Sequence, residues 1–172
     1  MSNIIIKIVN NDYINNDSIA NAIHYIYRTP ECKSKKTEWL PIYAYGIYTF
    51  PPTYESLITD FQAPYKITNI ERSSQYQHLW HLIFCFDCSA LTDKHYKWID
   101  SIAGLLGLAF PLCYSYHYDT EYPHCHMLIS TATFLPEEEY LTSKKLAEYL
   151  SFSTVTSSFR FQLNDEGGFF NV

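Results

Sequence analysis

The sequence lacks the long apolar runs, internal repeats and Gly/Ser-rich linkers that anchor a chain in a membrane or divide it into domains. Its first apolar run, residues 3–9 (NIIIKIV), is too short for a secretory signal peptide or a transmembrane helix. The 172 residues therefore predict a single domain over 1–172, long enough to bury a core. We expect a cytoplasmic protein with no membrane segment.

Excess basic charge is also missing, because 12 Lys and Arg residues stand against 18 Asp and Glu residues, for a formal net charge of −6. This balance argues against a protein that coats nucleic acid non-specifically. A contact with DNA would depend on a local patch, on base stacking or on a metal ion. The best basic cluster is Arg28, Lys33, Lys35 and Lys36, followed by Trp39, and a solvated loop explains it equally well.

Cysteines are few and odd in number, five in all, which predicts free thiols in a reducing compartment. Cys85 and Cys88 form one CxxC, and without a second pair this spacing is weak evidence for zinc. Aromatic residues, in contrast, are abundant at 17%, with 16 Tyr among them. Tyrosine fills cores, but it also stacks on bases and can act as a nucleophile.

The spacing of apolar residues predicts an α+β fold with a central antiparallel sheet and helices packed on it. Strands are expected over 3–9, 42–50, 79–86, 112–118, 124–132 and 153–163. Helices are expected between them, beginning at capping residues Asp17 or Ser18, Thr53, Thr92 or Asp93, and Thr142 or Ser143. The Thr29-Pro30 step should end the first helix, because the residue before proline avoids the helical region.

Residues 117–126 (HYDTEYPHCH) contain three of the seven histidines. Side chains alternate along a strand, so His124 and His126 point to one face and Cys125 to the other. A hairpin would bring His117 near them and create a cation site with three nitrogen ligands. Asp119 is close enough in sequence to orient one of the rings. A hairpin with scattered core histidines is the plainer alternative.

Together these segments resemble the relaxases, the mobilisation nucleases of plasmids and integrative elements within the HUH endonuclease superfamily. The resemblance rests on HLIFCFD, on LT opening a helix, on LLGLAF and on YSYHYDTEYPHCHMLIS, in that order. NAIHYIYRTPECK at 21–33 is similar, more loosely, to the family's N-terminal Tyr-bearing helix.

The resemblance implies an HUH-type architecture and metal-dependent nicking and rejoining of single-stranded DNA through a 5′-phosphotyrosyl intermediate. It implies Tyr25 as nucleophile, with Tyr27 as the second candidate and His24 as a minor one. His117, His124 and His126 would hold Mg²⁺ or Mn²⁺ by family analogy, although ligand softness favours Mn²⁺ or Zn²⁺. Asp119 would fix a histidine tautomer or assist deprotonation of the tyrosine. Glu121 is a weaker candidate ligand, and His81 is expected in the sheet beneath the site.

The implied partners are single-stranded DNA at an origin of transfer, accessory mobilisation proteins and a secretion coupling protein. Two alternatives remain open. A rolling-circle replication initiator or HUH transposase would use a downstream tyrosine, here Tyr140 or Tyr149. A non-catalytic, metal-containing module would bind nucleic acid through its aromatic surface and form no covalent adduct.

Overall fold

The computed structural model describes residues 3–9, 13, 16–29, 40–67, 77–135, 140–155 and 160–165. In these residues the order of elements is β1 (Asn3–Ile8), α1 (Asn16–Tyr27), β2 (Tyr43–Tyr45), α2 (Tyr54–Ile67), β3 (Leu79–Phe86), α3 (Asp93–Leu106), β4 (Leu112–His117), β5 (His124–Ser130), α4 (Ser143–Val155) and β6 (Arg160–Asp165). This order is the one that the sequence predicts, and it confirms the α+β class. Lys33, Lys35, Lys36 and Trp39 lie outside the described residues.

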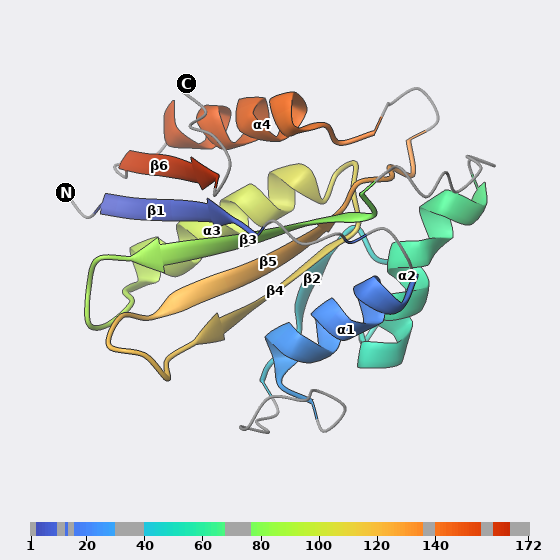
Figure 1. The fold of residues 1–172 in the computed structure, drawn as a ribbon, viewed down its shortest axis with the longest axis horizontal. Helices are drawn as coiled ribbons and strands as arrows, with labels where there is room; N and C mark the ends of the chain where they lie inside the picture. The colour runs from blue at the N-terminus through green and yellow to red at the C-terminus, as the bar shows by residue number, and fades with distance from the viewer. Residues whose placement is uncertain are drawn as a thin grey trace.

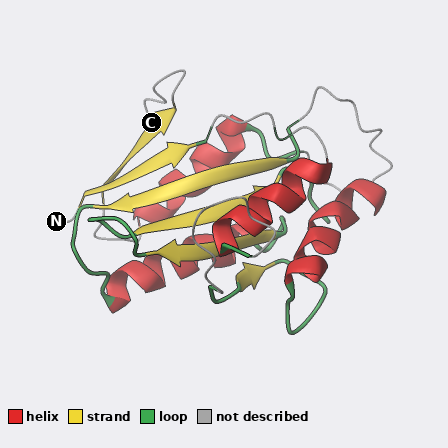
Figure 2. Ribbon diagram, turned by 60° about the horizontal axis from the view of Figure 1, so that its bottom comes forward, coloured by secondary structure: helices red, strands yellow, loops and turns green. Residues whose placement is uncertain are grey.

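The described strands form one sheet in the order β2-β4-β5-β3-β1-β6 (Figure 1). Neighbours from β2 to β1 are antiparallel, as expected, whereas β6 pairs with β1 in parallel. Helices cover both faces (Figure 2). None of the helices in the described part of the chain is long and apolar enough to cross a membrane.

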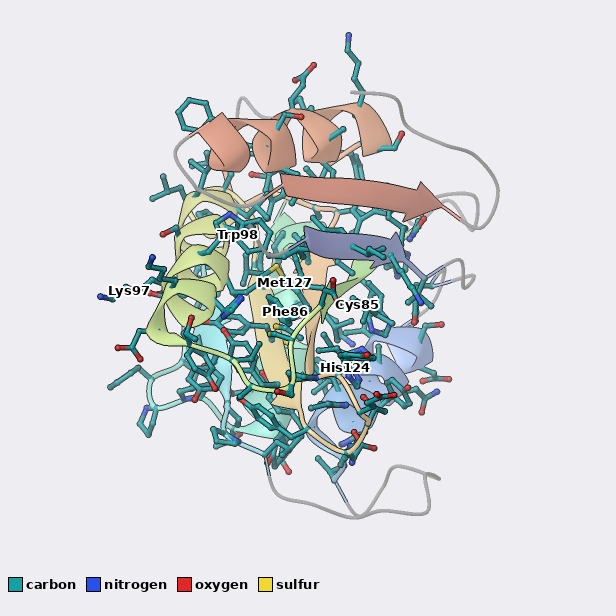
Figure 3. The ribbon with its side chains drawn as sticks, turned by 90° about the vertical axis from the view of Figure 1, so that its left-hand side faces the viewer. Cys85, Phe86, Lys97, Trp98, His124 and Met127 are labelled. Atoms are coloured by element: carbon teal, nitrogen blue, oxygen red, sulfur yellow. The ribbon has the colours of Figure 1, made fainter. Side chains whose placement is uncertain are left out.

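Alternation along the strands divides the core into two clusters on opposite faces of the sheet. One cluster packs α3 and α4 against Cys125, Met127 and Ile129 of β5. The other packs α1 and α2 against Leu128 of β5 and Cys113 of β4. His124 and His126 alternate with Cys125 and Met127, so they belong to the face that α1 covers. Figure 3 shows the same division, with Trp98 on the side of α3 and His124 towards α1.

The expected strand over 42–50 is mostly wrong, because only Tyr43–Tyr45 pairs with β4. Gly46 follows with a φ of 61°, a left-handed conformation that turns the chain out of the sheet. Two residues further on, the amides of Tyr48 and Thr49 donate to the buried Asp60 carboxylate at 3.2 and 3.1 Å. Asp60 thus satisfies backbone donors that a strand would have given to a neighbour.

Two expected boundaries near helices also differ from the structure. The helix expected to end near Phe61 continues past Pro64 to Ile67. The Tyr65 hydroxyl in this last turn lies 2.7 Å from Thr131 Oγ1, a tertiary contact that stabilises the extension. The last helix continues to Val155, so the first residues of the strand expected over 153–163 are helical.

Candidate metal centre

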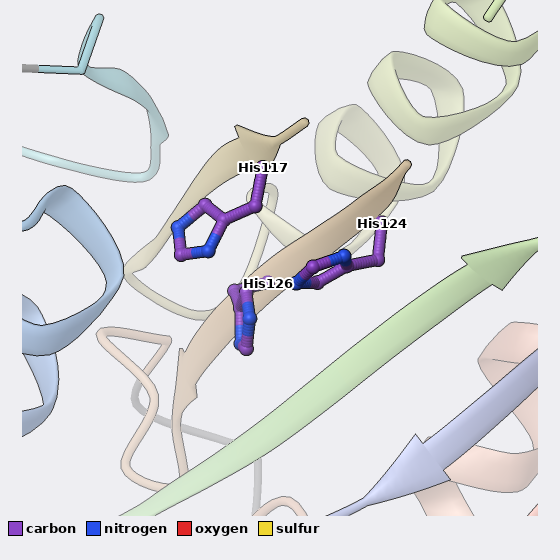
Figure 4. Close-up of side chains that lie close together, drawn as sticks. All are labelled: His117, His124 and His126. Carbon is purple, nitrogen blue, oxygen red and sulfur yellow. The ribbon is translucent and has the colours of Figure 1, made fainter. Parts of the chain in front are cut away.

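The β4–β5 hairpin brings together the three histidines that the sequence singles out. In its register His117 lies opposite His124, and Ser115 lies opposite His126. One nitrogen from each of these three rings lies within 4.8 Å of the others. The ring centroids are 4.4 Å apart for His117 and His126 and 5.0 Å apart for His124 and His126. Figure 4 shows the three rings converging, and we call this group the histidine triad.

His126 is oriented by His81, a histidine outside the triad that lies beside it on strand β3. The His126 Nδ1 atom lies 2.8 Å from His81 Nε2, and His81 Nδ1 lies 2.9 Å from the Tyr13 hydroxyl. If His126 presents the lone pair of Nε2 to a cation, its Nδ1–H donates to His81. His81 then donates through Nδ1–H to the Tyr13 hydroxyl. The tautomer of His126 therefore determines the tautomer of His81 in this series of hydrogen bonds.

His117 is oriented by the end of helix α1. Its Nε2–H donates to the carbonyl oxygen of Ile26 at 2.7 Å, within the last turn of the helix. The last carbonyls of a helix have no partner inside it, so this bond satisfies one of them. It also fixes the tautomer of His117, so that Nδ1 carries the lone pair and is the atom that can bind a metal.

Burial keeps the triad in the neutral form that binds metals. Burial lowers the pKa of His117 to about 4 and that of His81 to about 4. It also lowers the pKa values of His124 and His126. A neutral imidazole keeps a lone pair on one ring nitrogen at neutral pH, and three such rings form a donor set suited to Zn²⁺ or Mn²⁺. The histidine triad can therefore hold a metal ion.

Arg28 lies against the ligand atom of His117. Its Nη2 atom lies 3.1 Å from His117 Nδ1 and 2.7 Å from Asp119 Oδ1. The Arg28 guanidinium therefore links Asp119 to His117. The hydrogen bond from Arg28 lowers the pKa of the Asp119 carboxyl, which makes it a weaker base.

The two candidate nucleophiles on α1 lie in different surroundings. The Tyr25 side chain is 47% exposed, and its ring centroid lies 5.6 Å from that of His126 and 6.2 Å from that of His81. Tyr27 is fully buried, and its hydroxyl lies 3.1 Å from each of two carbonyl oxygens, those of Tyr43 and Tyr114. Burial also raises the pKa of Tyr27. Of the two, Tyr25 is the residue that solvent, and therefore a substrate, can reach.

A pocket of about 420 Å³ opens beside Tyr25. Its lining combines aromatic rings, one amide and aliphatic side chains: Val9, Tyr13, Asn21, Ala22, Tyr25, His81 and Ile83. The volume lies in the range of small-ligand sites, and a nucleobase can stack on rings of this kind. The pocket gives one face of the candidate site a surface suited to an unpaired nucleotide.

The other candidate residues lie apart from the triad or at its exposed rim. His24 Nδ1 lies 2.8 Å from Thr29 Oγ1, and Glu121 is an exposed turn residue. Tyr149 packs on Phe110 in the core of the opposite face, and Tyr140 packs near Tyr65.

Sequence reasoning missed the places of Arg28 and Tyr13, whereas His81 lies on β3 in the sheet beside His126, as expected. Arg28 stands out in the sequence only as a basic residue, and Tyr13 as one of many tyrosines. No protein-family model and no curated protein matches this chain.

Proposed function

We propose that this protein nicks and rejoins single-stranded DNA by tyrosine transesterification, with Tyr25 as the nucleophile and the histidine triad as the site of a divalent cation. The observation that carries the proposal is the exposed residue Tyr25 beside three neutral imidazoles, of which those of His117 and His126 are buried and that of His124 is half-buried. Metal-assisted phosphoryl transfer needs both a nucleophile and a cation site at one place.

His124 and His126 would bind the cation through Nε2, and His117 through Nδ1, as their other hydrogen bonds dictate. When bound, a divalent cation polarises the scissile phosphate and neutralises the charge that develops on it. Ligand softness favours Mn²⁺ or Zn²⁺, while the resemblance to relaxases favours Mg²⁺ or Mn²⁺. Mn²⁺ satisfies both considerations.

Tyr25 performs the covalent step. Its phenolic oxygen attacks phosphorus, so that a bond from Tyr25 to phosphorus forms as the bond from phosphorus to the 3′ oxygen breaks. The phenolic proton passes to solvent, and the departing 3′ oxygen becomes a hydroxyl by taking up a proton. The phosphotyrosyl link retains a phosphodiester-like bond, so attack by a 3′ hydroxyl on the same phosphorus rejoins the strand.

The pocket beside Tyr25 supports a single strand rather than a duplex as the substrate. Its aromatic lining suits a base that has left the stack, and duplex DNA keeps its bases paired. The resemblance adds the wider setting: an HUH architecture, cytoplasmic action at an origin of transfer, and mobilisation with accessory proteins and a secretion coupling protein.

Covalent capture of DNA tests the proposal. Single-stranded oligonucleotides taken from the DNA that flanks the gene of this protein are incubated with the protein and Mn²⁺. The reaction is then examined for an SDS-resistant protein–DNA band. We expect the band with wild type, and its loss with EDTA or in Tyr25→Phe. Loss in Tyr149→Phe or Tyr140→Phe instead would indicate the initiator or transposase alternative. Retention of DNA without any covalent band would indicate the non-catalytic module.

A further inference from the structure

We infer that Arg28 competes with the cation for His117 and, once displaced, binds the phosphate of the substrate. This inference rests on the proposed function and assigns a role to a residue that the resemblance does not name. The guanidinium holds the His117 ligand atom until a cation takes it. Arg28 then stays beside the cation through Asp119 and turns to the DNA backbone.

The first support is that one nitrogen makes both contacts. Arg28 Nη2 lies 3.1 Å from His117 Nδ1 and 2.7 Å from Asp119 Oδ1. A terminal guanidinium nitrogen carries two hydrogens, which is enough for one bond to each partner. Nδ1 of a neutral imidazole has a single lone pair, because its other nitrogen here donates to the Ile26 carbonyl oxygen. That lone pair can serve Arg28 or a cation, but not both.

The second support is the unusual backbone conformation of Arg28. Arg28 follows the last residue of α1 and has a φ of 53°, a left-handed conformation that residues other than glycine seldom adopt. The residue is nonetheless buried, at 8% exposure. Strained backbone persists where surrounding contacts over-determine it, and such positions concentrate at functional sites.

The third support is the ion pair with Asp119, which holds the Arg28 guanidinium in place when a cation occupies His117 Nδ1. Arginine presents a planar fork that suits two phosphate oxygens at once. A guanidinium held by Asp119 within reach of the triad would meet a phosphate bound there. Binding of phosphate would in turn offset the repulsion between the cation and the arginine. Cation and DNA should therefore bind cooperatively.

The decisive variant is Arg28→Gly, because glycine adopts the left-handed conformation without strain while removing the guanidinium. We expect it to bind Mn²⁺ alone about 10- to 100-fold more tightly than wild type, the size expected for loss of one charged hydrogen bond. Binding of a single-stranded oligonucleotide in the presence of Mn²⁺ should weaken about 10-fold or more. Mn²⁺ affinity is measured by electron paramagnetic resonance and DNA affinity by fluorescence anisotropy, both in a Tyr25→Phe background that prevents cleavage.

Lys97→Ala is the matched control, since it changes the net charge equally at an exposed position on α3. It should leave both affinities unchanged. Unchanged or weaker Mn²⁺ binding in Arg28→Gly, with clear binding in wild type, would overturn the inference and leave the proposed function standing. Binding of Mn²⁺ by Arg28→Gly but not by wild type would support it. Absence of Mn²⁺ binding in both proteins would overturn the metal site and the inference with it.

Discussion

The rings of Tyr25 and His126 lie nearly perpendicular to each other, with centroids 5.6 Å apart and ring planes at 86°. Tyr25 comes from the last turns of α1, whereas His126 comes from β5, about a hundred residues later in the chain. Packing of α1 over β4 and β5 creates this proximity, since the same helix end also accepts a hydrogen bond from His117. A single contact between helix and sheet thus positions both the candidate nucleophile and the candidate cation site.

Tyr25→Phe should abolish covalent attachment to DNA and lower the rate of nicking by at least about 1,000-fold, because the substitution removes only the attacking oxygen. The ring is half exposed, so the free energy of unfolding should stay within about 0.5 kcal/mol of wild type. Nicking is measured on a labelled oligonucleotide, and unfolding by urea titration.

Tyr149→Phe is the matched control for this prediction, because Tyr149 lies on α4 and packs against Phe110 in the cluster on the other face of the sheet. It should nick as wild type does. Full activity in Tyr25→Phe would remove Tyr25 from the reaction and return the question to the downstream tyrosines.

Local patterns in the sequence are enough to predict the hairpin that carries the triad. Alternation places His124 and His126 on one face, and the short connector after His117 implies antiparallel pairing. The order of the strands and helices follows from similar local patterns. These parts are predictable because neighbours in the sequence determine them.

The surroundings of the triad depend on contacts between distant segments, which local patterns do not contain. Arg28 meets Asp119 only because the chain turns left-handed after α1 and α1 packs at the end of β4. Tyr13 meets His81 across 68 residues of sequence. The short β2 also depends on a distant segment. The backbone amides that follow β2 donate to the carboxylate of Asp60 on α2 and not to a neighbouring strand.

Adding Mn²⁺ should raise the melting temperature of the wild-type protein, because a ligand that binds only the folded state stabilises it. At a concentration about 100 times the dissociation constant, the gain is about 2.7 kcal/mol. For a chain of this size that gain corresponds to about 5 to 10 °C. The shift is measured by scanning fluorimetry against an EDTA-treated sample.

His124→Ala should lose most of this shift, because it removes one of the three ligand nitrogens while His124, as the least buried of the three, contributes least to the core. Its melting temperature in EDTA supplies the baseline. An equal shift in wild type and His124→Ala would place the ion elsewhere on the protein.

His81→Phe should weaken Mn²⁺ binding about 10- to 100-fold, although His81 is not itself a ligand in the proposed site. Phenylalanine keeps an aromatic ring at this position but accepts no hydrogen bond, so the Nδ1–H of His126 loses its partner and the ring loses its fixed orientation. The buried His126 Nδ1–H group, which loses this partner, should also lower the free energy of unfolding by about 1 to 3 kcal/mol. Calorimetric titration with Mn²⁺ and urea unfolding measure the two effects.

His95→Phe separates these effects, because His95 is also buried but lies at the start of α3, where its ring nitrogen accepts the backbone N–H of Thr92. It should destabilise the fold and leave Mn²⁺ affinity unchanged. If both variants weakened Mn²⁺ binding equally, the loss would reflect general destabilisation and not the orientation of His126.

Two glycine-to-alanine substitutions should change stability in opposite directions. At Gly46 the backbone φ is 61°, and an added Cβ would lie 2.7 Å from the Phe110 carbonyl oxygen and 2.8 Å from that of Gly107. We expect Gly46→Ala to lower the free energy of unfolding by about 2 to 4 kcal/mol, since left-handed strain and backbone overlap add. At Gly104, within α3, no atom beyond the neighbouring residues and the helix's own backbone lies within 4 Å of an added Cβ. Gly104→Ala should therefore raise the free energy of unfolding by about 0.5 to 1 kcal/mol through helix propensity.

Urea unfolding of both variants beside wild type measures the pair under identical conditions. The contrast tests the end of β2 directly, because Gly46 is the point where the chain leaves the sheet and approaches the turn after α3. A neutral Gly46→Ala would mean that this approach is looser than 2.7 Å and that β2 could extend further along β4. A large loss at Gly46 with a gain at Gly104 ties the short β2 to the close backbone contact and not to a general intolerance of alanine.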